Sequence, residues 1–161
     1  MPPAPYPAVV ALLDSISQQA DELQDALQAF GLGVTTGIDE LEAHMVATSE
    51  VVELQTEHKF TPGLYTRVCH IPAGVMSTTK IHNTTHPLFL MQGSASVWTA
   101  EKGWATLHAP CAVETTPNTR RIFFAHTYTI AVTCHPNPED ETDLKKIEDR
   151  IMLKHHNTLL S

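Results

Sequence analysis

The sequence predicts a mainly β domain, a sandwich or a closed barrel, with one helix before it and another after it. Residues 51–135 alternate between apolar and polar positions, and turn residues interrupt this alternation often. No helical pattern separates the strands, so a parallel sheet with crossover helices is excluded. Helical spacing is confined to the two ends of the chain. A length of 161 residues is enough for one domain with a buried core.

The first 50 residues form the predicted N-terminal helical region. Apolar side chains recur at spacings of three and four over residues 7–30, Pro7 suits the first turn, and Gly31 ends the helix. The narrow apolar seam fits packing on a barrel, of the same chain or of a partner, and it also fits self-association into a homo-oligomer. A second, short helical pattern covers residues 38–45.

Residues 51–138 form the predicted barrel, whose strands are separated by turn residues. Residues 94–99 and 104–108 form a hairpin around Gly103, and residues 121–125 and 128–134 form another hairpin-like pair around His126. Further strands are predicted at 64–71, 88–91 and 112–115. Residues 139–161 hold the C-terminal helix, predicted from Asp140 to His156, because acids precede an apolar stripe and basic residues follow it.

Composition excludes several classes of function. The net charge of −8 argues against nucleic-acid binding, which needs clustered Lys and Arg. No apolar stretch approaches the roughly 20 residues that span a bilayer, and the N-terminus is unlike a signal peptide, so we expect a cytoplasmic protein without a membrane partner. The three cysteines are far apart, so neither a disulfide framework nor a thiolate zinc site is expected.

The most informative segment runs from Gly74 to Gly93 and contains Lys80, His82 and His86. Lys80 and His82 are two residues apart, so on a strand both side chains would share one face. His86 directly precedes an apolar strand and is expected near the mouth of the barrel.

This segment resembles the first motif of the cupin superfamily. That motif places two histidines and a glutamate between two glycines, and the matching positions here are Lys80, His82 and His86. The second cupin motif is similar to residues 116–121, where Arg121 stands at the ligand position. The nearest resemblance is to small cupin-like proteins of tailed phages and prophages. It rests on residues 58–67, 80–86, 117–121 and 133–148, and it implies a host cytoplasm as the location.

The resemblance implies a site with two alternative chemistries. A metal-binding cupin holds a divalent transition metal, for which His82 and His86 are the candidate ligands here; a third would come from one of the other histidines, His70, His108, His126 or His135. Lys80 and Arg121 are cations and would repel a metal. The same four side chains, with Tyr65 beside them, fit an anion, because Arg offers a planar fork and Lys a mobile charge.

Three functions follow from these alternatives. The first is a small-molecule-binding cupin with no certain cofactor, whose pocket accepts an anionic, nucleotide-like ligand and which sequesters or modifies a host metabolite or signal. The second is a metal-dependent isomerase, lyase or dioxygenase that uses His82 and His86. The third is a structural or assembly protein that works through its N-terminal helix.

Overall fold

The computed structural model describes residues 35–153. The chain divides into two compact units, Met1–Glu50 and Val51–Ser161. In the first unit, helix α2 spans Thr35–Thr48, which confirms the short helix predicted over residues 38–45 and extends it at both ends. The predicted helix over residues 7–30, with its apolar seam, lies outside the described residues.

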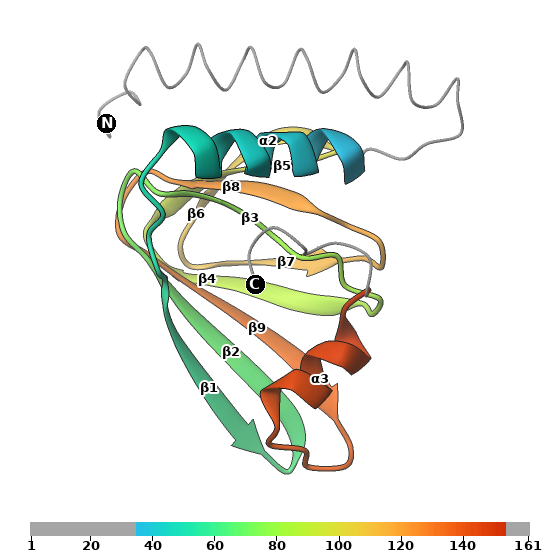
Figure 1. The fold of residues 1–161 in the computed structure, drawn as a ribbon. Coiled ribbons are helices and arrows are strands. Elements are labelled where there is room, and N and C mark those ends of the chain that lie inside the picture. The colour runs from blue at the N-terminus through green and yellow to red at the C-terminus, as the bar shows by residue number, and fades with distance from the viewer. Residues whose placement is uncertain (1–34, 154–161) are drawn as a thin grey trace. The chain divides into compact units, whose positions relative to one another are not determined.

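The second unit is built from two antiparallel sheets (Figure 1). The five-stranded sheet has the order β1-β2-β9-β4-β7, and the four-stranded sheet has the order β3-β8-β5-β6. The bounds of the strands are β1 Gln55–Thr61, β2 Gly63–Ile71, β3 Met76–Thr78, β4 His86–Gln92, β5 Ser94–Thr99, β6 Gly103–His108, β7 Cys111–Thr115, β8 Arg121–Ala125 and β9 Thr129–Asn137.

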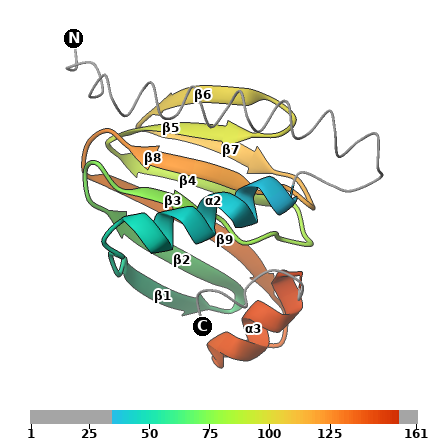
Figure 2. The ribbon, with the colours of Figure 1, turned by 45° about the horizontal axis from the view of Figure 1, so that its top comes forward.

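The strand pairs are nested in one another, which identifies the architecture. Strand β5 pairs with β6, β4 with β7, β3 with β8 and β2 with β9, so the chain is a long hairpin rolled into two layers. This is the double-stranded β-helix, or jelly roll. It confirms the predicted fold class of a mainly β domain with helices at both ends. Among the described strands no pairing joins the two sheets, so the layers form a sandwich rather than a closed barrel (Figure 2).

The predicted hairpin around His126 is wrong. Strand β8 pairs with β3 and β5, whereas β9 pairs with β2 and β4, so the chain crosses from one sheet to the other at this turn. The backbone N–H groups of His126 and Thr127 donate to the Ser94 carbonyl, which holds the crossing against the start of β5. Local alternation identified both strands correctly, but their partners are far away in the sequence.

The apolar core lies between the two sheets. Its buried residues come from both layers: Ile71, Leu88, Leu90, Ala95, Val97, Phe123, Ala125 and Ala131. Gly93 joins β4 to β5, with a φ of 87°. A Cβ there would collide with the Tyr128 carbonyl, so this turn requires glycine for both its conformation and its space.

Helix α3 spans Leu144–Ile151 and is shorter than predicted. The Asp143 side chain accepts hydrogen bonds from the N–H groups of Lys145 and Lys146, which fixes the start of the helix. Asp140 has a φ of 50°, so the helix cannot begin at that residue. After Ile151 the chain turns extended, and Met152 pairs with His82 in a β-bridge. Ile147 and Ile151 pack on Tyr65 and anchor α3 to the sheet.

Neither helix in the described part of the chain has the length and apolar character needed to cross a membrane.

Candidate metal and anion site

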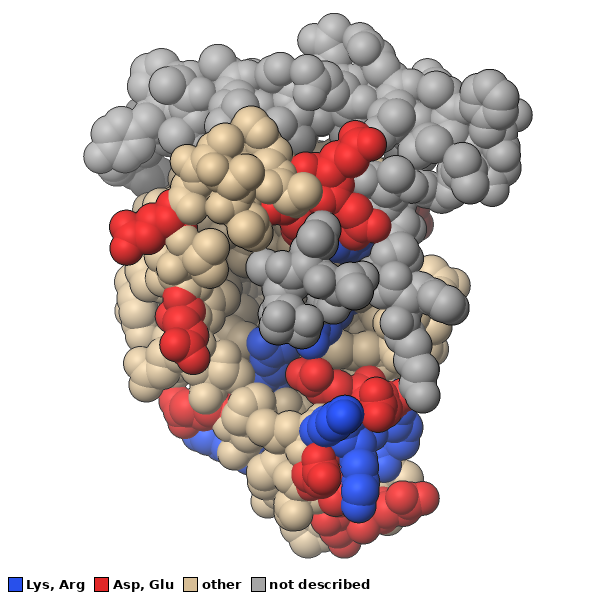
Figure 3. Space-filling view, in the orientation of Figure 1, with Lys and Arg blue, Asp and Glu red and all other residues tan. Residues whose placement is uncertain are grey.

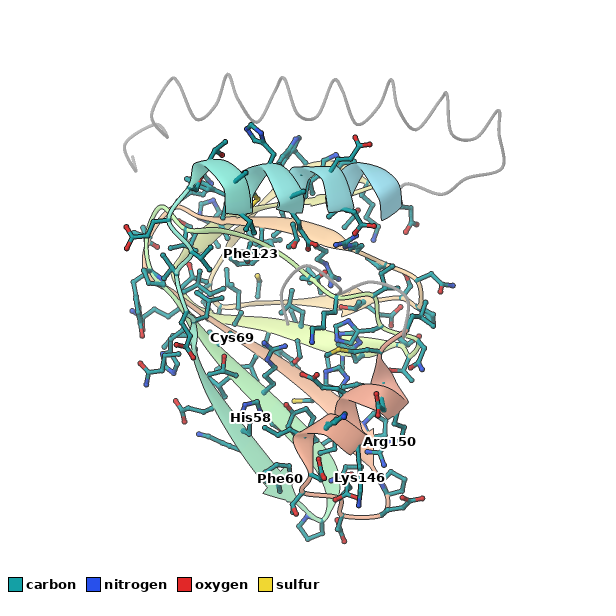
Figure 4. The ribbon with its side chains drawn as sticks, in the orientation of Figure 1. His58, Phe60, Cys69, Phe123, Lys146 and Arg150 are labelled. Carbon is teal, nitrogen blue, oxygen red and sulfur yellow. The ribbon has the colours of Figure 1, made fainter. Side chains whose placement is uncertain are left out.

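The candidate site occupies one end of the inner face of the five-stranded sheet. Tyr65 on β2 lies opposite His135 on β9, and His86 on β4 lies opposite Thr115 on β7. Side chains two residues apart along a strand share a face. Tyr65 therefore shares the face of the core residue Ile71, and the apolar core and this polar row are parts of the same surface. Figure 4 shows Cys69 and Phe123 toward one end of the sandwich, and His58 and Phe60 toward the other.

His82 reaches the same place from a segment outside the sheets. Strand β3 ends at Thr78, so Lys80 and His82 do not lie on one regular strand as predicted. The end of α3 holds this segment in place: the N–H of Asn83 donates to the Ile151 carbonyl over 3.0 Å, and the N–H of Leu153 donates to the Ile81 carbonyl over 3.0 Å. The sheet positions His86 and His135, whereas α3 positions His82.

These three histidines form a compact, buried cluster. One ligand nitrogen from each ring lies within 4.8 Å of those of the other two. The ring centroids of His82 and His86 are 4.4 Å apart, those of His86 and His135 are 4.3 Å apart, and those of His82 and His135 are 5.2 Å apart. We call His82, His86 and His135 the histidine triad.

The triad is neutral at physiological pH. Burial, reinforced by the neighbouring imidazoles and arginines, lowers the pKa of His82 to about 3 and that of His135 to about 4. Burial also lowers the pKa of His86, with a further contribution from Arg121. Because protonation blocks the lone pair that a metal needs, neutral rings are the form that can bind one.

The tautomer of His86 follows from its hydrogen bond. Its Nδ1 lies 3.1 Å from the carbonyl oxygen of Thr84. A carbonyl can only accept, so Nδ1 carries the proton and donates it. The lone pair is therefore on Nε2, the other ring nitrogen. A metal-binding histidine usually donates its second N–H to a carbonyl or carboxylate in this way.

Two arginines adjoin the triad: Arg121 is buried and Arg67 is half-buried. Arg121 on β8 is 7% exposed, and its charge lowers the pKa values of His82 and His86. Arg67 on β2 lowers those of His82 and His135. Among the described residues, the charged groups that act on the triad pKa values are these arginines and the triad rings themselves, with no carboxylate. The site is therefore electropositive.

Unpaired polar atoms gather around the triad. Five buried side-chain atoms of the described chain have no hydrogen-bond partner: Arg67 Nε, Thr84 Oγ1, Trp104 Nε1, Thr115 Oγ1 and His135 Nδ1. All except that of Trp104 belong to triad residues or their neighbours. Burying a polar atom without a partner costs about 1–3 kcal/mol. A concentration of such atoms in one place indicates a site that a ligand or ion completes.

Tyr65 forms the wall of the site next to His135. Its ring is 4% exposed and stacks on that of His135 at a centroid distance of 6.0 Å. Its hydroxyl is hydrogen-bonded to Nδ1 of the exposed His58 over 2.8 Å. Burial raises the pKa of Tyr65, so the phenol is protonated at physiological pH. A chain of polar groups thus runs from the molecular surface to the side of the triad.

Lys80 lies apart from these residues. Its ammonium group is 3.2 Å from the Glu148 carboxylate on α3, and its side chain is 43% exposed. Lys and Arg side chains alternate with acids over this end of the molecule (Figure 3). The structure therefore brings His82, His86, Arg121 and Tyr65 together, and it places Lys80 in a surface ion pair.

The remaining candidate histidines also lie elsewhere. His70 bonds Glu57 and Tyr128, each over 2.7 Å. His126 bonds Ser96 over 2.7 Å, and His108 is exposed on β6. Sequence reasoning gave all four candidates equal weight, because alternation along one strand does not reveal which end of the inner face a residue occupies. It did not single out Arg67 as a site residue, although Arg67 shares a strand face with Tyr65.

The donor set fits a divalent transition metal. Three neutral imidazoles suit zinc, copper, iron or nickel, and a catalytic zinc site typically has three protein ligands. The two guanidinium groups oppose a bare cation, and they favour an anion beside it.

Solved structures with a similar fold include several cupins. They include a cupin 2 conserved barrel domain protein from Salinispora arenicola (16% identity, TM-score 0.43, covering 50% of this chain and 74% of that one). KdgF from a Halomonas species is 18% identical, with a TM-score of 0.46 and coverage of 56% and 89%. An RmlC-like cupin family protein from Methanocaldococcus jannaschii is 13% identical, with a TM-score of 0.45 and coverage of 56% and 86%.

These likenesses are distant, and the fold assignment rests on the strand pairing. The sequence matches no protein-family model, and no curated protein matches it.

Proposed function

We propose that this protein binds a small anionic molecule in its jelly roll, at a divalent transition metal held by His82, His86 and His135. The observation that carries the proposal is the convergence of three buried, neutral imidazoles whose ligand nitrogens lie within 4.8 Å of one another. The unpaired polar atoms around them support it, because a bound ion and ligand would supply the missing partners.

The anionic character of the ligand is inferred from Arg67 and Arg121. Both guanidinium groups act on the triad, and Arg67 has a buried Nε without a partner in the described chain. Guanidinium groups bind carboxylates and phosphates through paired N–H donors. The sequence resemblance to phage proteins supports a viral setting, in which such a pocket sequesters or modifies a host metabolite.

Metal titration of the untagged protein tests this proposal. After removal of metals with a chelator, we expect the wild type to bind one Co²⁺ per chain, with the visible absorption bands of a nitrogen-ligated site. His82→Gln, His86→Gln and His135→Gln should each weaken binding by about 10-fold or more. His70→Gln is the matched control, because His70 lies on the same sheet and bonds only to surface groups.

Two outcomes would contradict the proposal. One is a folded wild type that takes up no Co²⁺, Zn²⁺ or Ni²⁺. The other is equal metal affinity in His135→Gln and His70→Gln, which would remove the triad from the site.

The second candidate is a metal-dependent enzyme, supported by the hydrogen bond between Tyr65 and His58. A protonated phenol beside the triad, connected to an exposed imidazole, can exchange protons with solvent. A screen of the metal-loaded protein for isomerase, lyase and dioxygenase turnover tests this function. Turnover that falls in Tyr65→Phe at unchanged metal content is the expected result; turnover equal to that of the wild type would exclude a role for the phenol.

A further inference from the structure

The charge balance of the pocket restricts what it can bind. The triad contributes three neutral rings, and the two arginines contribute two positive charges. Among the described residues, no acid appears among the groups that shift the triad pKa values. A divalent ion in the triad would therefore bring the local charge to about +4, in a place where water screens poorly.

Two carboxylates on elements next to the triad, on α3 and β7, lie at the surface. Glu148 pairs with Lys80 at the surface. Glu114 is exposed, and it is its backbone carbonyl that contacts Arg121, over 3.4 Å. Neither carboxylate is among the charges that act on the triad rings.

Two neutral hydroxyl groups also indicate a ligand with several oxygens. Thr115 is fully buried, lies opposite His86, and has a hydroxyl without a partner among the described residues. The hydroxyl oxygen of Thr84 is also buried and without a partner among the described residues. Hydroxyl groups and guanidinium N–H groups donate to oxygen, so one oxyanion can satisfy both kinds of donor while it also coordinates a metal.

We infer that the pocket takes a dianionic, metal-coordinating oxyanion of the dicarboxylate or phosphate class, and that the metal and this anion raise each other's affinity. The inference rests on the proposed function and adds the ligand class and the coupling. Linkage requires the effect to be reciprocal: the anion strengthens metal binding by the same factor as the metal strengthens anion binding. A monoanion leaves more of the positive charge uncompensated and gives weaker coupling.

Co²⁺ titrations in three buffers of equal ionic strength test the coupling. The buffers contain malonate, inorganic phosphate or acetate, and a reference chelator in each one corrects for metal bound by the buffer anion. For the wild type we expect Co²⁺ to bind about 10-fold or more tightly in malonate or phosphate than in acetate. The two dianion arms distinguish a dicarboxylate from a phosphate ligand by which gives the larger factor.

Arginine variants should have opposite effects on Co²⁺ binding in the dianion buffers and in acetate. Arg67→Met and Arg121→Met should reduce the dianion effect to less than about threefold, because they remove the anion's partners. In acetate, the same variants should bind Co²⁺ more tightly than the wild type, because the repulsion of the metal is relieved. Lys59→Met is the matched control, since it removes a positive charge from exposed β1 and should change neither value.

The outcomes separate this inference from the proposed function. Equal Co²⁺ affinity of the wild type in malonate, phosphate and acetate would overturn the coupling and leave the metal site intact. Co²⁺ binding that weakens in acetate when either arginine is removed would also overturn it, because the arginines would then be structural supports. A folded protein that binds no Co²⁺ in any buffer would overturn both. Two arginine positions keep the test valid if one variant fails to fold.

Discussion

The two ends of the inner face of the five-stranded sheet differ in what they contribute. At one end Leu90, Ala131 and Ile71 pack with the opposite sheet into an apolar core. At the other, His86, His135 and Arg67 face a region where buried polar atoms lack partners. The first end gains stability from every atom it buries. The second loses stability, and a ligand would recover it. One sheet therefore carries both the apolar core that stabilises the fold and the polar residues of the candidate site.

Truncation in the apolar end should have the largest effect on folding. Leu90 is 1% exposed, and Leu90→Ala should lower the free energy of unfolding by about 3–5 kcal/mol, from lost burial and a residual cavity. Urea unfolding measures this change. Metal stoichiometry of the folded variant should stay at the wild-type value; its loss would show that the two ends are not separable.

Acid should act mainly on the polar end. The folded-state pKa values of about 3 for His82 and about 4 for His135 lie below the ordinary 6.5. Between these values the unfolded state binds more protons, so stability is complete above pH 6.5 and is lost as the pH falls. For the metal-free protein we expect each of these two rings to contribute a loss of about 2 kcal/mol between pH 7.5 and 5, on the order of 4 kcal/mol in all.

Urea unfolding across this pH range provides the measurement. His135→Gln should flatten the pH dependence, whereas the control His70→Gln should keep it. An equally steep dependence in both variants would place the acid-sensitive groups outside the triad.

Replacing Arg67 tests whether this arginine stabilises the fold or lowers the stability of the metal-free protein. Arg67→Met removes a buried, unpaired Nε and fills the same space with an apolar chain. We expect the metal-free variant to be more stable than the wild type by about 1 kcal/mol. Thermal unfolding in chelator measures it. A variant clearly less stable than the wild type would mean that Arg67 supports the fold, contrary to the cost assigned to the polar end.

The smallest effect is expected at the surface. The ion pair of Lys80 and Glu148 is largely exposed, so Lys80→Ala should change stability by less than about 0.5 kcal/mol. Co²⁺ affinity in malonate should match that of the wild type. A clear loss of anion-dependent binding would return Lys80 to the site, in the role that the sequence resemblance gave it.

The sequence by itself determined the strands and the class of fold. Strands β5 and β8 occupy the predicted residues, because alternation along a strand depends on neighbouring residues only. Asp143 and Gly93 mark a helix start and a turn through local chemistry, although the acids upstream of Asp143 made the predicted helix begin too early. Strand β1 and the short β3 were not predicted as separate strands, since their alternation is weak.

Only the tertiary structure decided which side chains meet. His86 and His135 are about 50 residues apart and become neighbours because β4 pairs with β9. His82 joins them through the bridge to Met152, beyond a helix whose position no local pattern encodes. Pairing between distant strands also placed β8 and β9 in different sheets. The position of α3 brought Glu148 to Lys80. Residue types predicted a polar site in this sequence, and pairing between distant strands selected its members.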